Sequence, residues 1–243
     1  MTKDTKDWFT SWFDTPFYHI LYKNRDDQEA QSFMETLTSY LNIPLESKIL
    51  DLGCGKGRHA VYLNSIGYDV TGVDLSPQSI AFAKEFENDT LHFDVHDMSK
   101  PYPEKFNVVF NLFTSFGFFE DDDDNLKTIK AIKANLVPNG IGVIDFMNVN
   151  HVVHNLIPED IKTIDGIDFY LKRYVENNFI LKDISFRIDN KQYNYIERVK
   201  AITLEDFKIM FEKANVQLLD IFGDYKLNKF DANNSERLIM IFM

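Results

Sequence analysis

The sequence predicts an α/β fold, in which a seven-stranded, mostly parallel sheet carries helices on both faces. Short apolar runs alternate with helical patterns across residues 43–150, which is typical of a parallel sheet. A strand-like alternation then fills much of residues 151–200, which predicts an antiparallel β lid. We therefore expect a helical cap over residues 1–42, a core over residues 43–150 and 201–243, and the lid over residues 151–200.

The predicted core is organised around a glycine-rich turn that follows its first strand. Residues 49–52 form a short apolar run closed by glycine, which indicates a buried parallel strand. Gly53, Gly55 and Gly57 then allow the backbone to approach a ligand closely, because they carry no Cβ. A helical pattern follows at once, and strand, glycine loop and helix together predict a nucleotide-binding turn. A dinucleotide fingerprint would need a further glycine where this chain has Arg58, so a mononucleoside ligand is favoured.

An acidic residue ends the second predicted strand, which covers residues 68–74. The carboxylate of Asp74 at this position can accept hydrogen bonds from both ribose hydroxyls of a nucleoside. The alternative role of the same carboxylate is to cap a turn. Ser76 and Pro77 then provide an N-cap and a first-turn proline for the next helix.

A third strand is predicted at residues 91–95. His92, Asp94 and His96 alternate along one face of it, a spacing that would also suit a metal ion. Alternation of polar residues on a strand edge is more often plain exposure, so we expect no metal site.

Two of these stretches resemble a known family. The segments ILDLGCGKGRHAVYL and GYDVTGVDLSPQSIAFAKE resemble the first two motifs of class I S-adenosylmethionine-dependent methyltransferases. The resemblance covers residues 43–149, and residues 203–243 by strand pattern. It implies a Rossmann-like fold, S-adenosyl-L-methionine as cofactor and S-adenosyl-L-homocysteine as product. It also implies transfer of a methyl group by in-line displacement, here to a small-molecule acceptor through a nitrogen or oxygen atom.

The resemblance further implies where the cofactor lies. In this family an acid just past the third strand accepts from the adenine amino group, and the next residue lines the ring; Asp97 and Met98 match those places. An N-terminal tyrosine or arginine near the methionine end of the cofactor would be Tyr22 or Arg25. The expected cofactor-binding residues are Tyr22, Arg25, Asp51, Gly53, Gly55, Arg58, Asp74, Leu75, Asp97, Met98, Asn111 and Phe113.

The acceptor site is expected where the fourth strand, at residues 106–112, ends. Family members that methylate nucleic acids or protein amides often carry an Asn/Asp-Pro-Pro-Tyr-type motif here, whereas this chain has NLFTSFG. The phenylalanines of this segment suggest an apolar or aromatic pocket, and the alternative is that half of them are core. The expected pocket residues are Thr114, Ser115, Phe116 and Asn148.

Methyl transfer needs a general base only where the acceptor arrives protonated. His19, His151 and His154 are candidates by residue type, and the sequence does not choose among them. Three alternatives to a small-molecule methyltransferase stay open. They are a nicotinamide oxidoreductase, which Arg58 disfavours, a S-adenosylmethionine-binding protein with other chemistry, and a non-catalytic binding module.

The remaining segments supply supporting elements. The acidic run at residues 120–124 is expected to cap a helix that extends to Leu136, because acids favour the positive end of a helix. Residues 138–140 predict a turn before a fifth strand at residues 141–147. Three lid strands, a helix and a final antiparallel pair of strands complete the chain. They are expected at residues 167–175, 179–188, 191–200, 204–214, 216–222 and 238–242.

The amino-acid composition narrows the classes of molecule that the protein is expected to bind. A net charge of −12 and a pI near 4.9 argue against a nucleic-acid surface, which would be basic. The single cysteine, Cys54, allows no internal disulfide. We find no apolar leader or membrane-spanning run, so we expect a cytoplasmic monomer or homodimer without membrane contact. Aromatic residues crowd positions 7–22, and we expect a short helix that packs on the domain or forms a flap over the site.

Overall fold

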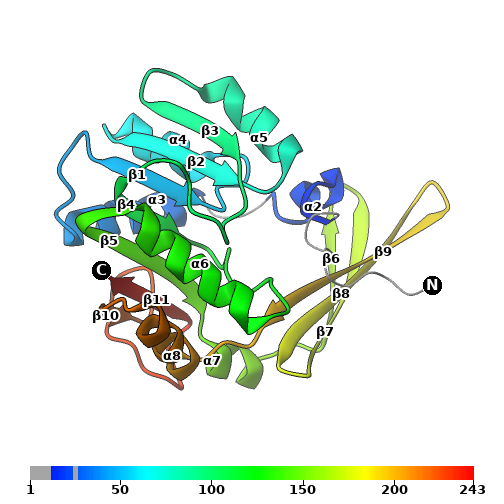
Figure 1. The fold of residues 1–243 in the computed structure, drawn as a ribbon. Coiled ribbons are helices and arrows are strands. Elements are labelled where there is room, and N and C mark those ends of the chain that lie inside the picture. Colours follow the sequence, from blue (N-terminus) through cyan, green and yellow to red (C-terminus); the bar gives the residue numbers. More distant parts are fainter. Residues whose placement is uncertain (1–11, 24–26) are drawn as a thin grey trace.

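The computed structural model describes residues 12–23 and 27–243, which form two sheets with helices around them (Figure 1). The larger sheet, sheet A, has the order β10 (Leu218–Phe222), β11 (Arg237–Phe242), β5 (Leu136–Met147), β4 (Phe106–Asn111), β1 (Lys48–Leu52), β2 (Asp69–Asp74) and β3 (Leu91–Val95). β11 runs antiparallel to its neighbours β5 and β10, whereas β5, β4, β1, β2 and β3 pair in parallel. The predicted seven-stranded, mostly parallel sheet is confirmed.

Helices cover both faces of sheet A. They are α3 (Asp27–Tyr40), α4 (Arg58–Ser65), α5 (Pro77–Ala83), the short η1 (Lys84–Phe86), α6 (Asp122–Asn135), α7 (Val149–His154) and α8 (Leu204–Ala214). α3, α4 and α5 share an apolar cluster with Ile49 of β1, whereas α6 and α8 share a second cluster with Leu50. Adjacent residues of β1 therefore supply opposite cores, because side chains alternate along a strand and both faces are covered.

Helix starts follow the capping signals of the sequence. Ser76 caps α5 by accepting a hydrogen bond from the Ser79 backbone N–H, and Pro77 is the first helical residue. Asp121, within the acidic run, caps α6 by accepting from the Asp123 backbone N–H. The acidic run therefore begins a helix, as predicted.

The fifth strand starts earlier than predicted. β5 begins at Leu136, which pairs with Phe106, while Ile141 pairs with Val108. The residues between Leu136 and Ile141 form a bulge against β4, and Asn139 there has a φ of 61°. The turn expected at residues 138–140 is thus an irregularity inside the strand rather than its boundary.

The smaller sheet, sheet B, is an antiparallel meander with one strand more than predicted. Its order is β6 (Glu159–Ile164), β7 (Ile167–Glu176), β8 (Phe179–Ile188) and β9 (Lys191–Lys200). β7, β8 and β9 confirm the three expected strands, and β6 was missed. Each connection is a two-residue turn whose residues both have positive φ, the type I′ geometry that hairpins favour. The turns are Asp165-Gly166, Asn177-Asn178 and Asp189-Asn190.

The described part of the aromatic N-terminal segment packs on sheet B. Helix α2 (Pro16–Leu21) starts after Thr15, whose hydroxyl accepts from the Tyr18 backbone N–H at 3.2 Å. Trp12 is 1% exposed and lies 4.5 Å, centroid to centroid, from the ring of Tyr195. Phe17 lies 4.9 Å from the ring of Phe186 on the same sheet. The remaining residues of the expected aromatic helix, 7–11, lie outside the described residues.

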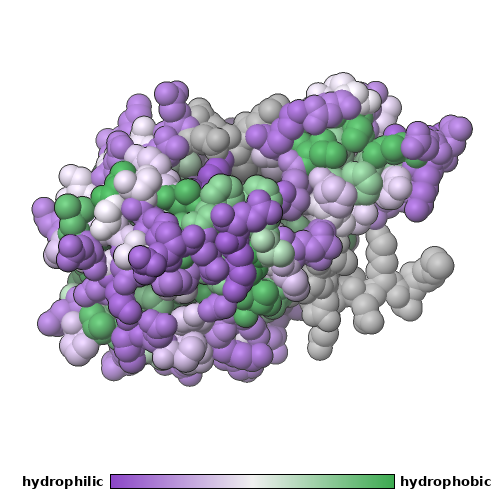
Figure 2. Space-filling view, turned by 90° about the horizontal axis from the view of Figure 1, so that it is seen from above, coloured by the Kyte–Doolittle hydropathy of each residue, from purple (hydrophilic) through white to green (hydrophobic). Residues whose placement is uncertain are grey.

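The surface seen in Figure 2 is largely hydrophilic, and apolar side chains show on it as separate patches. This agrees with the net charge of −12. Among residues 12–23 and 27–243, no helix has the length and apolar character to cross a membrane.

Candidate active site

The loops that follow the parallel strands gather at one edge of sheet A, because parallel strands share a direction. Sheet B lies beside this edge (Figure 1). Sheet B contacts the loop after β4, where the backbone N–H of Lys200, at the end of β9, donates to the carbonyl of Gly117 at 2.8 Å. Ligands of open α/β sheets bind at this edge, so the loops after β1 to β5 are the candidate site.

The glycine loop after β1 is packed on two sides and open on the third. The backbone N–H of Gly53 donates to the Val73 carbonyl at 2.8 Å. A Cβ at Gly53 would lie 2.8 Å from the Cβ of Ser115, and one at Gly57 would lie 2.6 Å from the ring of Phe93. A Cβ at Gly55 would meet no atom within 4 Å. The loop therefore borders open space at Gly55, as a ligand cradle requires.

Two buried oxygen atoms beside this loop lack hydrogen bonds. Within the described residues, Asp51 Oδ2 in β1 and Asn111 Oδ1 at the end of β4 have no partner. Asn111 Nδ2 donates to the Leu52 carbonyl at 2.7 Å, which places both residues at the β1–β4 junction. Buried acceptors without a donor are rare and costly. A ligand with N–H groups would satisfy both.

Burial, and then the charge of Asp74, raise the pKa of Asp51 to about 7, against a smaller lowering by a hydrogen bond from the Ala60 backbone. Asp51 therefore changes its charge near neutral pH.

Asp74 and Asp97 stand at the ends of β2 and β3. Asp74 Oδ2 accepts from the Gly55 backbone N–H at 2.9 Å, and Oδ1 accepts from the Ser76 backbone N–H at 2.8 Å. Burial raises the pKa of Asp74, against these hydrogen bonds. Each carboxylate oxygen can accept a second bond, so the carboxylate keeps capacity for ribose hydroxyls. Next to it, Leu75 is 39% exposed.

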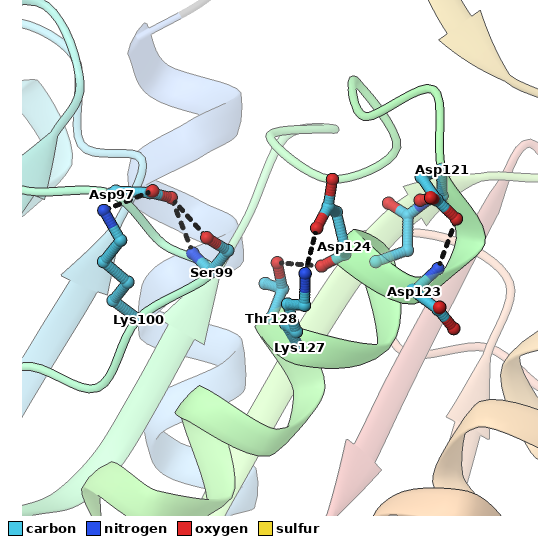
Figure 3. A network of polar contacts seen from close by, with 9 residues as sticks. Asp97, Ser99, Lys100, Asp121, Asp123, Asp124, Lys127 and Thr128 are labelled. Atoms are coloured by element: carbon cyan, nitrogen blue, oxygen red, sulfur yellow. Dashed lines mark hydrogen bonds and ion pairs between the residues drawn. The ribbon is translucent and has the colours of Figure 1, made fainter.

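Asp97 lines an open hollow of about 780 Å³ whose other side is the acidic start of α6 (Figure 3). Asp97 Oδ1 accepts from the Ser99 hydroxyl at 2.7 Å, and Oδ2 lies 3.3 Å from Lys100 Nζ. Burial raises the pKa of Asp97, but the hydrogen bonds from Ser99 and Lys100 outweigh it and lower the pKa. The carboxylate therefore stays ionised and can accept from an amino group. Met98 packs against the core beside it.

The hollow's acidic residues do not form a metal site. Asp121 serves as the helix cap, and Asp124 pairs with Lys127 at 2.6 Å (Figure 3). In the part of the chain that the structure describes, no group of three or more His, Cys, Asp and Glu side chains is placed to hold a metal ion.

The loop after β4 begins with two non-glycine residues in the left-handed region. Phe113 has a φ of 57° and Thr114 a φ of 62°. Asp145 on β5 accepts from both backbone N–H groups, from Phe113 through Oδ2 at 2.8 Å and from Thr114 through its carbonyl at 3.1 Å. Arg237 on β11 donates to Asp145 Oδ1 and to the Thr114 hydroxyl, both at 2.8 Å. Asp145 is 0% exposed.

Burial opposes the charge of Arg237, but the adjacent Asp145 carboxylate outweighs it and raises the Arg237 pKa. Arg237 therefore stays charged, and its contacts link β5 and β11 with the loop after β4.

The side chains of this turn reach the glycine loop. The Phe113 ring stacks on His59 of α4 at 4.2 Å between centroids, and it lies 5.6 Å from the ring of Tyr225. Ser115 Oγ donates to the Leu112 carbonyl at 2.9 Å and approaches the Gly53 carbonyl at 3.4 Å. The structure thus brings Ser115 against Gly53 and the Phe113 ring against His59, at the start of the helix that follows the glycine loop.

Two of the expected pocket residues are elsewhere, and those expectations need correction. Phe116 is 1% exposed and packs on Phe207 of α8 at 5.3 Å, so its ring belongs to the core. Asn148 is 4% exposed and its Nδ2 donates to the carbonyls of Ala232 and Ser235 at 3.1 and 2.8 Å. It holds the loop before β11 in place rather than lining a pocket.

The other residues that the sequence predicts for the site lie on several different helices. Arg58 opens α4, where its Nη2 lies 2.9 Å from His59 Nε2. His19 is on α2, whereas His151 and His154 are on α7, so the three candidate bases come from two helices. Arg25 lies outside the described residues.

The hydroxyl of Tyr22 donates to Glu197 of β9 at 2.7 Å, and it also contacts Lys182 of β8. Trp12 Nε1 donates to the same Glu197 carboxylate at 2.8 Å. Tyr22 is thus anchored on sheet B. Glu197 and Lys182 could not be predicted from the sequence, because their opposite charges on adjacent strands face each other only in the register of sheet B.

Comparisons with known proteins agree with this geometry. Residues 49–140 match the family model described as a methyltransferase domain. The glycine/sarcosine N-methyltransferase of Halorhodospira halochloris is 22% identical over 218 residues, which cover 85% of this chain and 79% of that protein.

Solved structures extend the likeness to nearly the whole chain. A S-adenosylmethionine-dependent methyltransferase from Clostridium acetobutylicum ATCC 824 superposes with a TM-score of 0.78 at 20% identity, covering 93% of this chain and 95% of that one. The sugar N-methyltransferase KedS8 from Streptoalloteichus sp ATCC 53650 gives a TM-score of 0.73 at 18% identity, covering 93% and 92%. At such identities the likeness establishes the fold.

The core position of Phe116 makes a prediction about stability. Truncation to alanine should lower the free energy of unfolding by about 3–5 kcal/mol, the usual loss for a buried phenylalanine. Chemical denaturation measures it, and Ile209→Ala, at a half-exposed residue of α8, is the control with little expected loss. Unchanged stability combined with lost turnover would return Phe116 to the acceptor pocket.

Proposed function

We propose that this protein, whose residues 49–140 match a methyltransferase domain, is a class I S-adenosylmethionine-dependent methyltransferase. We propose further that it methylates an amine-bearing small molecule held between sheet A and sheet B. The observation that carries the proposal is the pair of unpartnered oxygens, Asp51 Oδ2 and Asn111 Oδ1, beside the open glycine loop. The cofactor's methionine end carries an ammonium group, whose N–H donors match such acceptors.

The residues at the edge of sheet A fit the rest of the cofactor. Asp74 would accept from the ribose hydroxyls, and Asp97 would accept from the adenine amino group. Leu75 and Met98 are apolar neighbours of those carboxylates and would line the adenine. When bound, the cofactor supplies an electrophilic methyl group on its sulfonium. The chain's part is then to orient the two reactants, which can lower a barrier by roughly 7–11 kcal/mol.

Sheet B and α2 would form the far wall of the acceptor site. Lys200 and Arg198 of β9 pair with Asp122 and Glu120, which ties sheet B to the segment after β4. Phe118 of that segment joins the apolar cluster of α2 and sheet B, where its ring lies 5.2 Å from Phe13. A site enclosed this way excludes water, which favours attack by a neutral amine.

An amine acceptor suits both the relatives and the site. The names of the glycine/sarcosine and sugar enzymes specify N-methylation. An amine attacks through its lone pair once it has lost its proton. Because amines are mostly protonated in water at neutral pH, that proton must leave before transfer, and His19, His151 and His154 stay candidates for accepting it. The net charge of −12 and the acidic rim of the hollow disfavour a nucleic-acid acceptor.

A direct test is an acceptor panel. Purified protein is incubated with S-adenosylmethionine and glycine, sarcosine, an amino-sugar nucleotide or a phenol, and S-adenosylhomocysteine is measured by mass spectrometry. We expect product with an amine and not with the phenol. Tight salt-sensitive binding and methylation of RNA would contradict the small-molecule assignment, and nicotinamide-dependent redox activity would contradict the class.

Asp74→Ala should weaken S-adenosylmethionine binding by about 1–3 kcal/mol, the usual value for hydrogen bonds to a charged group. The matched control is Asp69→Ala, at the opposite end of the same strand, which should leave affinity unchanged. Calorimetric titration compares the two variants. Equal affinity in both would assign Asp74 to capping the Gly55 turn alone.

Cofactor affinity should rise with pH through neutrality. Below pH 7 the Asp51 carboxyl is mostly protonated, and above it the carboxylate can accept from the cofactor's ammonium, because its pKa is about 7. Calorimetry between about pH 6 and about pH 8 should show tighter binding at the higher pH in the unaltered protein. Asp51→Asn should remove this pH dependence. If the affinity of the unaltered protein does not change with pH, Asp51 is not the acceptor for the cofactor's ammonium group.

A further inference from the structure

The turn at Phe113 and Thr114 costs conformational free energy that the surrounding contacts must offset. Both residues occupy the left-handed region, where a Cβ crowds the backbone and glycine is the usual occupant. Such conformations persist where neighbouring groups over-determine them. Here the groups are Asp145 and Arg237, which make four hydrogen bonds with the turn and with each other.

We propose that Asp145 and Arg237 are positioning residues for the methyl-transfer step, and this rests on the proposed function. On the turn they contact its far side, the two backbone N–H groups and the Thr114 hydroxyl. Both also contact Tyr225, whose hydroxyl lies 3.5 Å from Asp145 Oδ2 and whose ring centroid lies 5.5 Å from the Arg237 guanidinium. The near side presents the Phe113 ring to His59 and Ser115 to Gly53. The pair therefore acts on the cleft through the turn, not by touching a reactant.

The guanidinium geometry is essential to this arrangement. Arg237 Nε donates to Asp145 while Nη2 donates to Thr114, so one planar group serves two partners, one in β5 and one in the loop after β4. A lysine ammonium carries the same charge but cannot span both partners with that fork. Arg237→Lys thus keeps the buried charge pair with Asp145 and releases the turn.

The other end of the same segment is also fixed. Gly117 accepts from the Lys200 backbone N–H at 2.8 Å, and Lys200 Nζ pairs with Asp122. Sheet B holds this end, whereas β5 and β11 hold Phe113 and Thr114. A change at Arg237 should therefore loosen the start of the segment while its end stays attached to sheet B.

The first measurement needs no acceptor. Amide hydrogen exchange of Phe113 and Thr114, followed by NMR, should be at least about tenfold faster in Arg237→Lys than in the unaltered protein. Exchange at Lys200, at the other end of the segment, should be unchanged. Equal exchange at Phe113 and Thr114 would overturn the proposal whether or not the protein has methyltransferase activity.

The second measurement separates positioning from binding. With the best acceptor of the panel, Arg237→Lys should lower kcat by about tenfold to a hundredfold, the scale of a small misplacement, with cofactor Kd changed less than about threefold. Phe211→Leu, in the core of α8, is the control for lost stability and should keep kcat. Unaltered kcat in Arg237→Lys, or a cofactor Kd that rises by the same factor as kcat falls, would refute a positioning role.

Thr114→Val tests the same hydrogen bond in a variant that keeps both buried charges. We expect faster amide exchange at Phe113 in this variant, and a smaller loss of kcat than in Arg237→Lys. Thr114→Ser keeps the hydroxyl, so its exchange rate and kcat should match those of the unaltered protein. If the unaltered protein binds S-adenosylmethionine but turns over no acceptor, the proposed function fails, and the exchange data still decide whether Arg237 holds the turn at Phe113 and Thr114.

Discussion

The place of β1 between β2 and β4 is the constraint on which the candidate site depends. Its pairing with β2 aligns the glycine loop with Val73 and Asp74, which accept hydrogen bonds from Gly53 and Gly55. Its pairing with β4 brings Asn111 to the Leu52 carbonyl. A shift of either register by one residue would exchange the two faces of the strand and separate these groups. The open space at Gly55, the buried acceptor atoms of Asp51 and Asn111 and the turn at Phe113 therefore all depend on how β1 pairs with its two neighbours.

Structural features that depend on a few neighbouring residues could be predicted from the sequence. The glycine loop, the Ser76-Pro77 helix start, the acidic cap of α6 and the strands β7 to β9 each depend on neighbours in the chain. β6 was missed because Glu159–Ile164 is mixed in polarity, although the Asp165-Gly166 dipeptide after it was a hairpin signal. The strand became visible only through its pairing with β7.

Properties set by distant contacts could not be predicted. Phe113 and Phe116 stand three residues apart in one apolar segment, yet one faces the glycine loop and the other the core against α8. Arg237 and Asp145 are 92 residues apart, so no local pattern joins them. The available signal was the one charged residue in each of two largely apolar strands, Asp145 in β5 and Arg237 at the start of β11. Buried charges need partners, and facing strands were the place to look.

The three hairpin turns of sheet B bear on the order in which the chain assembles. Each joins adjacent strands through two residues, so the sheet can form by local steps on the microsecond scale of hairpins. Sheet A instead requires β1 and β4 to meet across 59 residues, and it gains β11 last along the described chain. Since β11 carries Arg237, a growing chain would present a formed sheet B before the Phe113 turn could be locked. The geometry at the cleft is then among the last features of the fold to be established during synthesis.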